Sequence, residues 1–448
     1  SPRSSLSPLH NRAKRCCLLS PARRSGSSSI RASRPAPPSP ARTKSVQSPQ
    51  GSGHGCTASA TAVLTVPLGA LHVRPEGCPA CVVLYPARAG DRPPVRGASR
   101  AANPYWSAAA IEGLAAYAGL PSALLSDVLG GQHPFPPAAV KPAEGWDGWP
   151  LVIFSHGLGG CASMYVQICA HLASFGYIVV AIEHEDGSGC HAQTASGELL
   201  RYKRPPDGFV YCRDAVVGFR RPFFAKRVDE IAAVAAALHR GAATAAGTSV
   251  ETQAAQESLA SLLKTADVSR APLLVGHSFG AATVAIACRR VRAPAVVLLD
   301  PWAFALAPEE VARGVPPASL CVLCEAWLES EERHAIDALL GSSPGIVSLY
   351  ARHTRHQSIS DTSTWAPRLV SERMGGVGKG EAPHAARRAT AEACHALFSR
   401  VVAAATDGGA VEADLQAFLG GLSHPGSLEE FDFSIAPPAV APGFSRSP

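Results

Sequence analysis

The chain has 448 residues, 46% of them hydrophobic, so it is long enough to bury one large core or two ordinary ones. Its formal net charge is +6, but residues 1–75 contain eleven Lys and Arg and no Asp or Glu, which leaves the remainder at about −5. This balance excludes the basic surface expected of a folded nucleic-acid-binding domain.

The two ends of the chain lack the apolar periodicity of folded segments. Residues 1–60 are rich in Ser, Pro, Arg and Ala and cannot bury enough apolar surface to fold, so a disordered tail is expected. Their acid-free composition resembles an organellar transit peptide, and an arbitrary disordered tail fits equally well. We expect one domain over 61–425 and an extended tail over 426–448. A cytoplasmic or organellar location, peripheral on membranes at most, is favoured over secretion.

The first folded segments combine short strands with strongly apolar helices. Two β-rich runs within residues 62–86 predict an edge hairpin. Apolar side chains then recur at helical spacing between residues 105 and 129, at Tyr105, Trp106, Ile111, Leu114, Tyr117, Leu120, Leu124, Leu125, Val128 and Leu129. With few charges among them, these residues form either an ordinary pair of core helices or a surface that contacts lipid. No run of eighteen uncharged apolar residues occurs, so no membrane-spanning helix is expected.

The rest of the chain alternates buried strands with helices. Short apolar runs predict strands over 151–154, 177–182, 295–299, 319–324 and 345–350, the last of the sheet. Helical patterns occupy 164–175, 227–238, 252–263, 385–405 and 411–419. This order predicts an α/β fold in which helices cover both faces of a mostly parallel sheet.

Residues 272–286 predict a strand, a sharp turn and a helix, with Ser278 at the turn. Gly276 and Gly280 stand two residues before and after Ser278, where strand and helix approach too closely for a side chain. This arrangement is typical of the nucleophile elbow of the α/β-hydrolase fold, which is therefore the predicted fold class.

Two other patterns are interpreted as structural. The Gly-x-Ser-x-Gly letters recur at 341–345 around Ser343, but Pro344 removes a backbone donor and no buried strand precedes the serine, so a surface turn is expected. The Cys-x-x-Cys pairs at 78–81 and 321–324 lie in strand-like apolar runs far apart, which favours core cysteines over a zinc site. No metal and no cofactor is expected.

A serine hydroxyl becomes a nucleophile when a histidine accepts its proton and a carboxylate orients that histidine. In this fold the three occur in the chain order serine, acid, histidine, each at the carboxyl end of a strand. Asp300 directly follows the strand at 295–299 and is the candidate acid. Both His353 and His356 follow the strand at 345–350, and position alone leaves the choice of base between them open.

The tetrahedral intermediate of ester hydrolysis needs two backbone N–H groups directed at its oxyanion. One is expected from Phe279, the residue after Ser278. The Gly-rich segment 156–160 follows the strand at 151–154, and we assign the second donor to Leu158. The alternative is a flexible strand-to-helix turn without a catalytic role.

Five short motifs follow one another along the chain. They are Phe154-Ser-His-Gly-Leu-Gly159, Ala181-Ile-Glu-His-Glu-Asp186, Gly276-His-Ser-Phe-Gly280, Leu298-Leu-Asp-Pro-Trp302 and His356-Gln357. Each is common among α/β-hydrolases, but the five in this order, over about residues 66–420, resemble the plasma and intracellular type II platelet-activating-factor acetylhydrolases.

The resemblance implies a calcium-independent serine esterase that removes short or oxidised sn-2 acyl groups from glycerophospholipids at a membrane or lipoprotein surface. The helices within 105–129 would then face lipid. The site residues that it implies are Ser278 as nucleophile, Asp300 as acid, His356 rather than His353 as base, and Leu158 and Phe279 in the oxyanion hole.

Some segments depart from the family. Pro301 stands where alanine is usual and Ala281 replaces a glycine, but neither bears a reacting group. The segments 187–219 and 241–255 look unlike the family, which leaves the acyl preference open. Two other functions are considered: an α/β-hydrolase acting on soluble esters or polyesters, as cutinases and dienelactone hydrolases do, and a catalytically silent hydrolase fold used for binding.

Overall fold

The computed structural model describes residues 68–87, 106–129, 148–241, 250–316, 318–352, 354–362, 383–407 and 433–435. Within these ranges one nine-stranded sheet has the order β1-β2-β4-β3-β7-β8-β9-β10-β11. Its strands are β1 Leu68–Val73, β2 Cys81–Pro86, β3 Leu151–Ser155, β4 Ile178–Ile182, β7 Leu273–His277, β8 Val296–Leu299, β9 Ser319–Cys324, β10 Val347–Ala351 and β11 Phe433–Ile435. A separate two-stranded hairpin pairs β5 His191–Gln193 with β6 Leu199–Arg201.

The centre of the sheet is parallel and its edges are antiparallel. Strands β4, β3, β7, β8, β9 and β10 pair in parallel with their neighbours. The hairpin β1–β2 joins β4 antiparallel, and β11 joins β10 antiparallel. The prediction that the strand at 345–350 ends the sheet is therefore wrong, because residues 433–435 add one more strand. Three residues are too few to show an alternating pattern.

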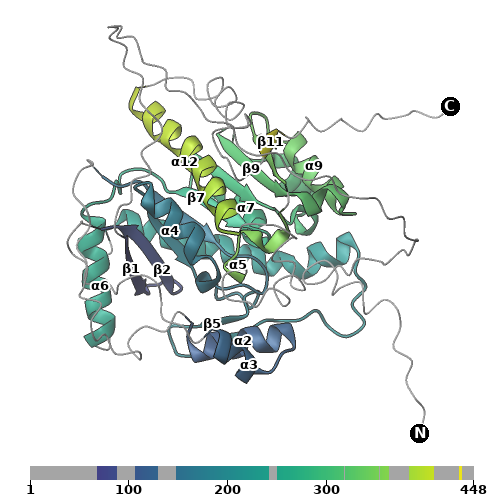
Figure 1. Cartoon of the computed structure of the whole chain (residues 1–448), viewed down its shortest axis with the longest axis horizontal. Coiled ribbons are helices and arrows are strands. Elements are labelled where there is room, and N and C mark those ends of the chain that lie inside the picture. The colour runs from purple at the N-terminus through teal and green to yellow at the C-terminus, as the bar shows by residue number, and fades with distance from the viewer. Residues whose placement is uncertain are drawn as a thin grey trace, which may run out of the picture.

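Helices cover both faces of this sheet (Figure 1). They are α2 Ala108–Ala118, α3 Ser122–Leu129, α4 Val166–Ser174, α5 Arg213–His239, α6 Val250–Leu263, α7 Phe279–Arg290, α8 Pro308–Arg313, α9 Arg333–Gly341 and α12 Pro383–Asp407, with the 3-10 turns η2 Ala162–Met164, η3 Ala303–Ala305, η4 Glu325–Glu329 and η5 His356–Ser358. Side chains of the parallel strands alternate between two cores: Val152 and Phe154 pack with α4 and α12, and Ile153 packs with α5 and α7. This two-sided burial is why the strands read as continuous apolar runs.

The apolar positions of α2 and α3 are mostly buried. Ile111, Leu114, Leu125 and Leu129 lie in the core that also contains α4, and Trp106 is 1% exposed. Leu124 of α3 is 52% exposed. The buried positions thus behave as a core helix pair, while Tyr105 lies outside the described residues. No helix in the described part of the chain is both long and apolar enough to cross a bilayer.

Several segments differ from the predicted boundaries. Helix α5 begins at Arg213 rather than at 227, because Pro222 and a run of Arg and Phe obscure the helical pattern of its first half. The unusual segment 187–219 contains the β5–β6 hairpin and the start of α5. The predicted helix over 411–419, the tail over 1–60 and residues 242–249 lie outside the described residues.

The second Gly-x-Ser-x-Gly segment is a turn with Gly341 and Pro344 exposed, as predicted, but its serine points into the protein. Ser343 is 2% exposed, and its hydroxyl donates to the carbonyl of Leu339 at 2.6 Å and accepts from the amide of Val315 at 3.0 Å. It therefore ties the end of α9 to a neighbouring loop, a tertiary contact that no local pattern announces. Ten cysteines in the described ranges are free thiols, and all of them except Cys212 are buried.

Candidate active site

Ser278 occupies the corner between β7 and α7. Its backbone has φ 57° and ψ −117°, a conformation that is strained for a residue with a side chain. A Cβ at Gly280 would collide with the carbonyl of Ser155, and one at Gly276 with the backbone of Gly280. Both glycines are thus required by the close approach of strand and helix, as the sequence predicted.

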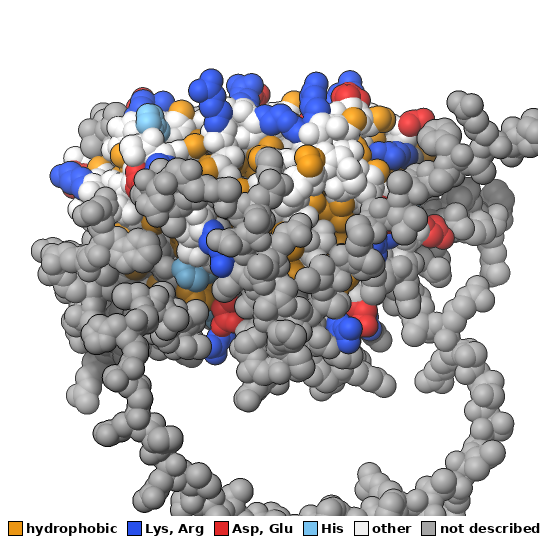
Figure 2. Space-filling view, turned by 90° about the horizontal axis from the view of Figure 1, so that it is seen from above, with side chains coloured by type: hydrophobic (Ala, Val, Ile, Leu, Met, Phe, Trp, Pro, Cys, Tyr) orange, Lys and Arg blue, Asp and Glu red, His pale blue; other side chains and the backbone are white. Residues whose placement is uncertain are grey.

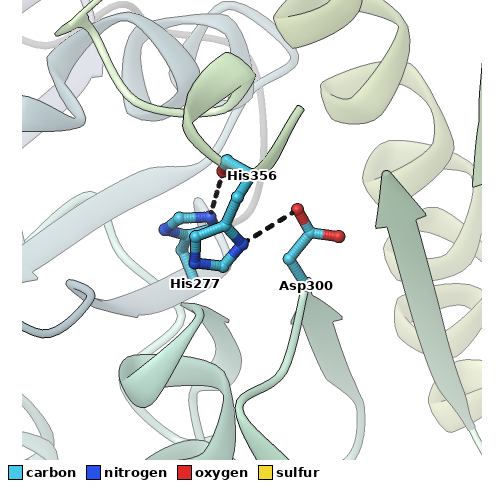
Figure 3. A group of neighbouring side chains, drawn as sticks. All are labelled: His277, Asp300 and His356. Atoms are coloured by element: carbon cyan, nitrogen blue, oxygen red, sulfur yellow. Dashed lines mark hydrogen bonds and ion pairs between the residues drawn. The ribbon is translucent and has the colours of Figure 1, made fainter. Parts of the chain in front are cut away.

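The structure brings Ser278, His356 and Asp300 together at the carboxyl ends of the parallel strands (Figure 3 shows His356 and Asp300). The Ser278 hydroxyl lies 2.9 Å from Nε2 of His356, and Nδ1 of His356 lies 3.3 Å from Oδ2 of Asp300. Asp300 is 2% exposed, and its other oxygen accepts from the amide of Cys324 at 2.6 Å. His353 lies outside the described residues. This arrangement can draw the hydroxyl proton onto the imidazole while the carboxylate fixes the ring.

His277, the residue before Ser278, belongs to a directional chain of hydrogen bonds. Its Nε2 donates to the carbonyl of His356 at 2.8 Å, so its Nδ1 must accept from the hydroxyl of Tyr165, at 2.9 Å. The Tyr165 oxygen in turn accepts from the amide of Gly157 at 3.2 Å. The chain therefore links the Gly-rich loop to the backbone of the candidate base.

His277, Asp300 and His356 form the group of metal-type ligands that the described residues bring together. Both ring nitrogens of His277 are engaged in the chain of hydrogen bonds, which leaves this ring no lone pair for an ion. Burial also lowers the pKa of His277 well below its usual value, so the ring is neutral. The donor set fits proton transfer better than metal binding.

Tyr165 allows a test of the coupling between the Gly-rich loop and the segment that carries His356. We expect Tyr165→Phe to lower kcat about tenfold with KM little changed, because the Gly157 amide and Nδ1 of His277 both lose a buried partner. Hydrolysis of 4-nitrophenyl acetate measures this. Tyr177→Phe is the matched control, since the Tyr177 hydroxyl contacts His395 away from Ser278. Equal rates for the two variants would contradict the coupling.

Leu158 and Phe279 carry the two backbone amides expected to form the oxyanion hole. Leu158 lines a pocket together with Ser278, Gly157 and the apolar side chains of Leu114 and Met164. The Phe279 ring turns away from the pocket and stacks on Phe224 at 4.2 Å. Within the described residues, neither the Leu158 amide nor the Phe279 amide donates to a protein group. Both amides are therefore available to an oxyanion.

A buried ion pair between Arg227 and Asp186 holds the Gly-rich loop in place. Arg227 of α5 donates to the carbonyl of His156 at 2.6 Å, to Asp186 at 3.0 Å and to Ser188 at 3.0 Å. Burial alone would raise the pKa of Asp186, but the Arg227 guanidinium lowers it below its usual value. The carbonyl of Ser188 accepts from the amide of Gly159 at 2.8 Å. Sequence reasoning missed Arg227, because nothing in a lone arginine on a helix indicates its partners.

A second Ser-His-carboxylate array lies in the same region. The Ser155 hydroxyl donates to Nε2 of His184 at 2.8 Å, and Nδ1 of His184 donates to Glu230 at 2.7 Å. These residues are 0%, 0% and 3% exposed, so no substrate reaches them. The array joins β3 and the end of β4 to α5 and is structural. The motif at 181–186 contained His184, but Glu230 carried no sequence signal.

Glu183 carries a mostly buried carboxyl next to the Gly-rich loop, with 16% of its side chain exposed. One of its oxygens accepts from the amide of Ala162 at 3.1 Å, and the other lies 3.6 Å from Nε2 of His156 with no hydrogen-bond partner. Burial raises the pKa of Glu183 to about 8. The folded protein therefore holds a proton on Glu183 at neutral pH that the unfolded chain releases.

This proton makes stability depend on pH. Because the folded-state pKa is the higher one, the free energy of unfolding should fall as pH rises from about 6.5 to about 8.5, by up to about 2 kcal/mol. Below that window the burial-lowered pKa values of His156, His184 and His277 act in the opposite direction. Urea unfolding at both pH values measures the slope. Glu183→Gln should reduce it and leave a smaller slope near pH 7 from Glu230, whose pKa burial raises to about 7; an unchanged slope would rule out Glu183 as a source.

Comparison with known proteins agrees with this geometry. The family model described as platelet-activating factor acetylhydrolase, isoform II, matches residues 99–407. The platelet-activating factor acetylhydrolase of Canis lupus familiaris is 30% identical over 178 residues, which are 37% of this chain and 38% of that protein. That of Gallus gallus is 49% identical over 51 residues, 11% of each chain. The matches thus span well under two thirds of these relatives.

Among solved structures, a ferulic acid esterase from Streptomyces cinnamoneus superimposes with a TM-score of 0.48 and 19% identity. The superposition covers 77% of this chain and 92% of that one.

Proposed function

Because this chain belongs to the family of platelet-activating factor acetylhydrolase, isoform II, we propose that it is a serine esterase that hydrolyses short or oxidised sn-2 acyl groups of glycerophospholipids. The observation that carries the proposal is the hydroxyl of Ser278, 2.9 Å from Nε2 of His356 at a strained strand-to-helix corner. The family model matches 309 residues of this chain, 99–407, and this range includes each residue of the site.

The proposed reaction passes through an acyl-enzyme. Nε2 of His356 accepts the Ser278 proton while Oγ attacks the ester carbonyl carbon, and Asp300 stabilises the imidazolium that forms. The tetrahedral intermediate collapses and expels the lysophospholipid alkoxide, which takes the proton from His356. Water then attacks the acyl-enzyme with His356 again as base, releasing the carboxylic acid and restoring Ser278.

Leu158 and Phe279 are proposed to stabilise the tetrahedral intermediate. Within the described residues their amides have no competing protein acceptor; Phe279 follows Ser278 directly in the chain, and Leu158 lines the same pocket as Ser278. Preorganised N–H donors of this kind stabilise the developing oxyanion more than the ground-state carbonyl. The network of Tyr165 and Arg227 keeps the Leu158 loop in place without contacting the reacting atoms.

The purified full chain tests the proposal. With 1-alkyl-2-acetyl-sn-glycero-3-phosphocholine and a calcium chelator, we expect equimolar release of acetate and the lysophospholipid. Hydrolysis of 4-nitrophenyl acetate without any release from the phospholipid would remove the proposed substrate class and leave the esterase.

A second candidate is an esterase for soluble substrates, and the packing of α2 and α3 favours it. Ile111, Leu114, Leu125 and Leu129 are buried in the core, so they are not available for the lipid contact considered from the sequence. Rates on a short-chain phosphatidylcholine below and above its critical micelle concentration separate the two. Activation by micelles supports the phospholipid surface, and saturation on monomers supports the soluble ester.

A further inference from the structure

Among the described residues, three arginines and no lysine are buried, and Figure 2 shows Lys and Arg with Asp and Glu beside them on one face. On helix α5, Arg221 is 66% exposed and pairs with Glu309, and Lys226 is 54% exposed. Arg220 differs, because it is 4% exposed and makes no ion pair with any described residue. A buried cation without a counter-charge is energetically unfavourable and calls for an explanation.

The two other buried arginines show the usual solution. Arg227, two turns further along α5, has Asp186, Ser188 and a backbone carbonyl as partners. Arg387 donates to two backbone carbonyls and to Gln167. Arg220 has one polar partner, the hydroxyl of Tyr202 at 2.7 Å, and its Nη1 is buried with none.

Aromatic rings surround the Arg220 guanidinium and place it beside the reaction centre. Its carbon lies 4.6 to 6.0 Å from the centroids of five rings, those of Tyr202, Phe219, Phe223, Phe279 and Trp302. Phe279 follows the candidate nucleophile directly, and Trp302 is two residues beyond the candidate acid. Ring faces attract a cation but do not neutralise it. Arg220 therefore keeps a net positive charge close to the ring of Phe279, one of the two residues expected in the oxyanion hole.

Tyr202 connects Arg220 to a residue of the substrate pocket. Its ring makes an edge-to-face contact with Tyr117 at 4.7 Å, and Tyr117 lines the pocket that contains Ser278. Tyr202 follows β6 and is half-buried, and its hydroxyl accepts from Nη2 of Arg220 at 2.7 Å. Tyr202 thus contacts both the guanidinium and a residue that lines the pocket, while Arg220 itself does not line it.

We propose that Arg220 binds the phosphodiester of the substrate headgroup, which replaces the Tyr202 hydroxyl as its partner. This inference rests on the proposed function, since a glycerophospholipid carries its phosphate on the carbon next to the one that bears the sn-2 ester. A guanidinium can donate two parallel hydrogen bonds to a phosphate, and the free Nη1 supplies the donor that Tyr202 leaves unused. Arg220 is then the residue by which the site distinguishes a phospholipid from a neutral ester.

Two substrates that differ only in the headgroup test this role. They are 1-alkyl-2-acetyl-sn-glycero-3-phosphocholine and 1-alkyl-2-acetyl-sn-glycerol, with the same short alkyl chain and below the critical micelle concentration. We expect Arg220→Gln to lower kcat/KM on the phospholipid about tenfold or more and on the neutral ester less than about twofold. Arg220→Lys keeps the positive charge but cannot donate two parallel hydrogen bonds, so it should lower kcat/KM by a smaller factor, and on the phospholipid alone. Arg221→Gln, the exposed neighbour, should leave both substrates unaffected.

The possible outcomes separate the inference from the function on which it rests. Equal losses on both substrates, in Arg220→Gln and in Arg220→Lys alike, would make Arg220 a structural residue. An undiminished rate on the phospholipid in Arg220→Gln would exclude the phosphate contact. Wild-type protein that cleaves the neutral ester but not the phospholipid would overturn the proposed substrate class and the inference with it.

Discussion

Ser278→Ala is expected to lower kcat for ester hydrolysis by about 10⁴-fold to 10⁶-fold, the largest effect of any substitution in this chain. The hydroxyl that lies 2.9 Å from Nε2 of His356 is then absent, and only binding and the oxyanion donors continue to assist water. The measurement is the steady-state rate on 4-nitrophenyl acetate, compared between variant and wild type at equal folded concentration.

Ser343→Ala is the matched control for this prediction. Ser343 stands in the same five-residue pattern, but it is buried at the end of α9 and engaged with Leu339 and Val315. We expect some loss of stability and an essentially unchanged kcat. A Ser278→Ala protein that retains more than about a hundredth of the wild-type rate would show that another group is the nucleophile.

Arg227→Met is expected to lower the free energy of unfolding by about 3 to 5 kcal/mol. The substitution leaves the carboxylate of Asp186 buried without a counter-charge, and it removes the donors to Ser188 and to the carbonyl of His156. Because these groups hold the Gly-rich loop, kcat should fall as well. Urea denaturation followed by circular dichroism gives the free energy.

Arg290→Met removes an ion pair of the same type from the surface. Arg290 and Asp229 are 59% and 62% exposed, so we expect a change of less than about 0.5 kcal/mol. If both substitutions lowered the free energy of unfolding equally, burial would not explain the contribution of the Arg227–Asp186 pair to stability.

The nucleophile elbow was predictable because its signal is local. The pattern of Gly276, Ser278 and Gly280 indicates a turn at which two backbone segments approach closely. The apolar run before it indicates a strand that is covered on both faces. Asp300 was predictable for a similar reason, since it ends such a strand. The choice of His356 over His353 came from the resemblance to a family rather than from position.

The supporting network was not predictable, because its members meet only in the folded chain. Arg227 and Glu230 lie on helix α5 and Tyr165 directly precedes α4, at positions where arginine, glutamate and tyrosine are ordinary residues. Strand β11 illustrates the same limit, since three residues far from β10 in sequence pair with it. The sequence could not decide whether α2 and α3 contact the core or lipid, because an apolar helix face has the same residue pattern in both cases.

Geometry between side chains is not sufficient to identify the nucleophile. The buried array of Ser155, His184 and Glu230 has distances of 2.8 and 2.7 Å, shorter than the 2.9 and 3.3 Å around His356. Access distinguishes the two, because Ser278 lines a pocket and Ser155 is 0% exposed. A network closed to solvent fixes the position of strands and helices, whereas one that opens on a pocket can act on a substrate.

The most direct test of the account is to identify the side chain that a fluorophosphonate modifies. Wild-type protein treated with the reagent, digested and analysed by mass spectrometry should carry one adduct, on Ser278, whose hydroxyl lies 2.9 Å from Nε2 of His356. An adduct on a different residue, or none at a concentration that inactivates the enzyme, would contradict the assignment of Ser278.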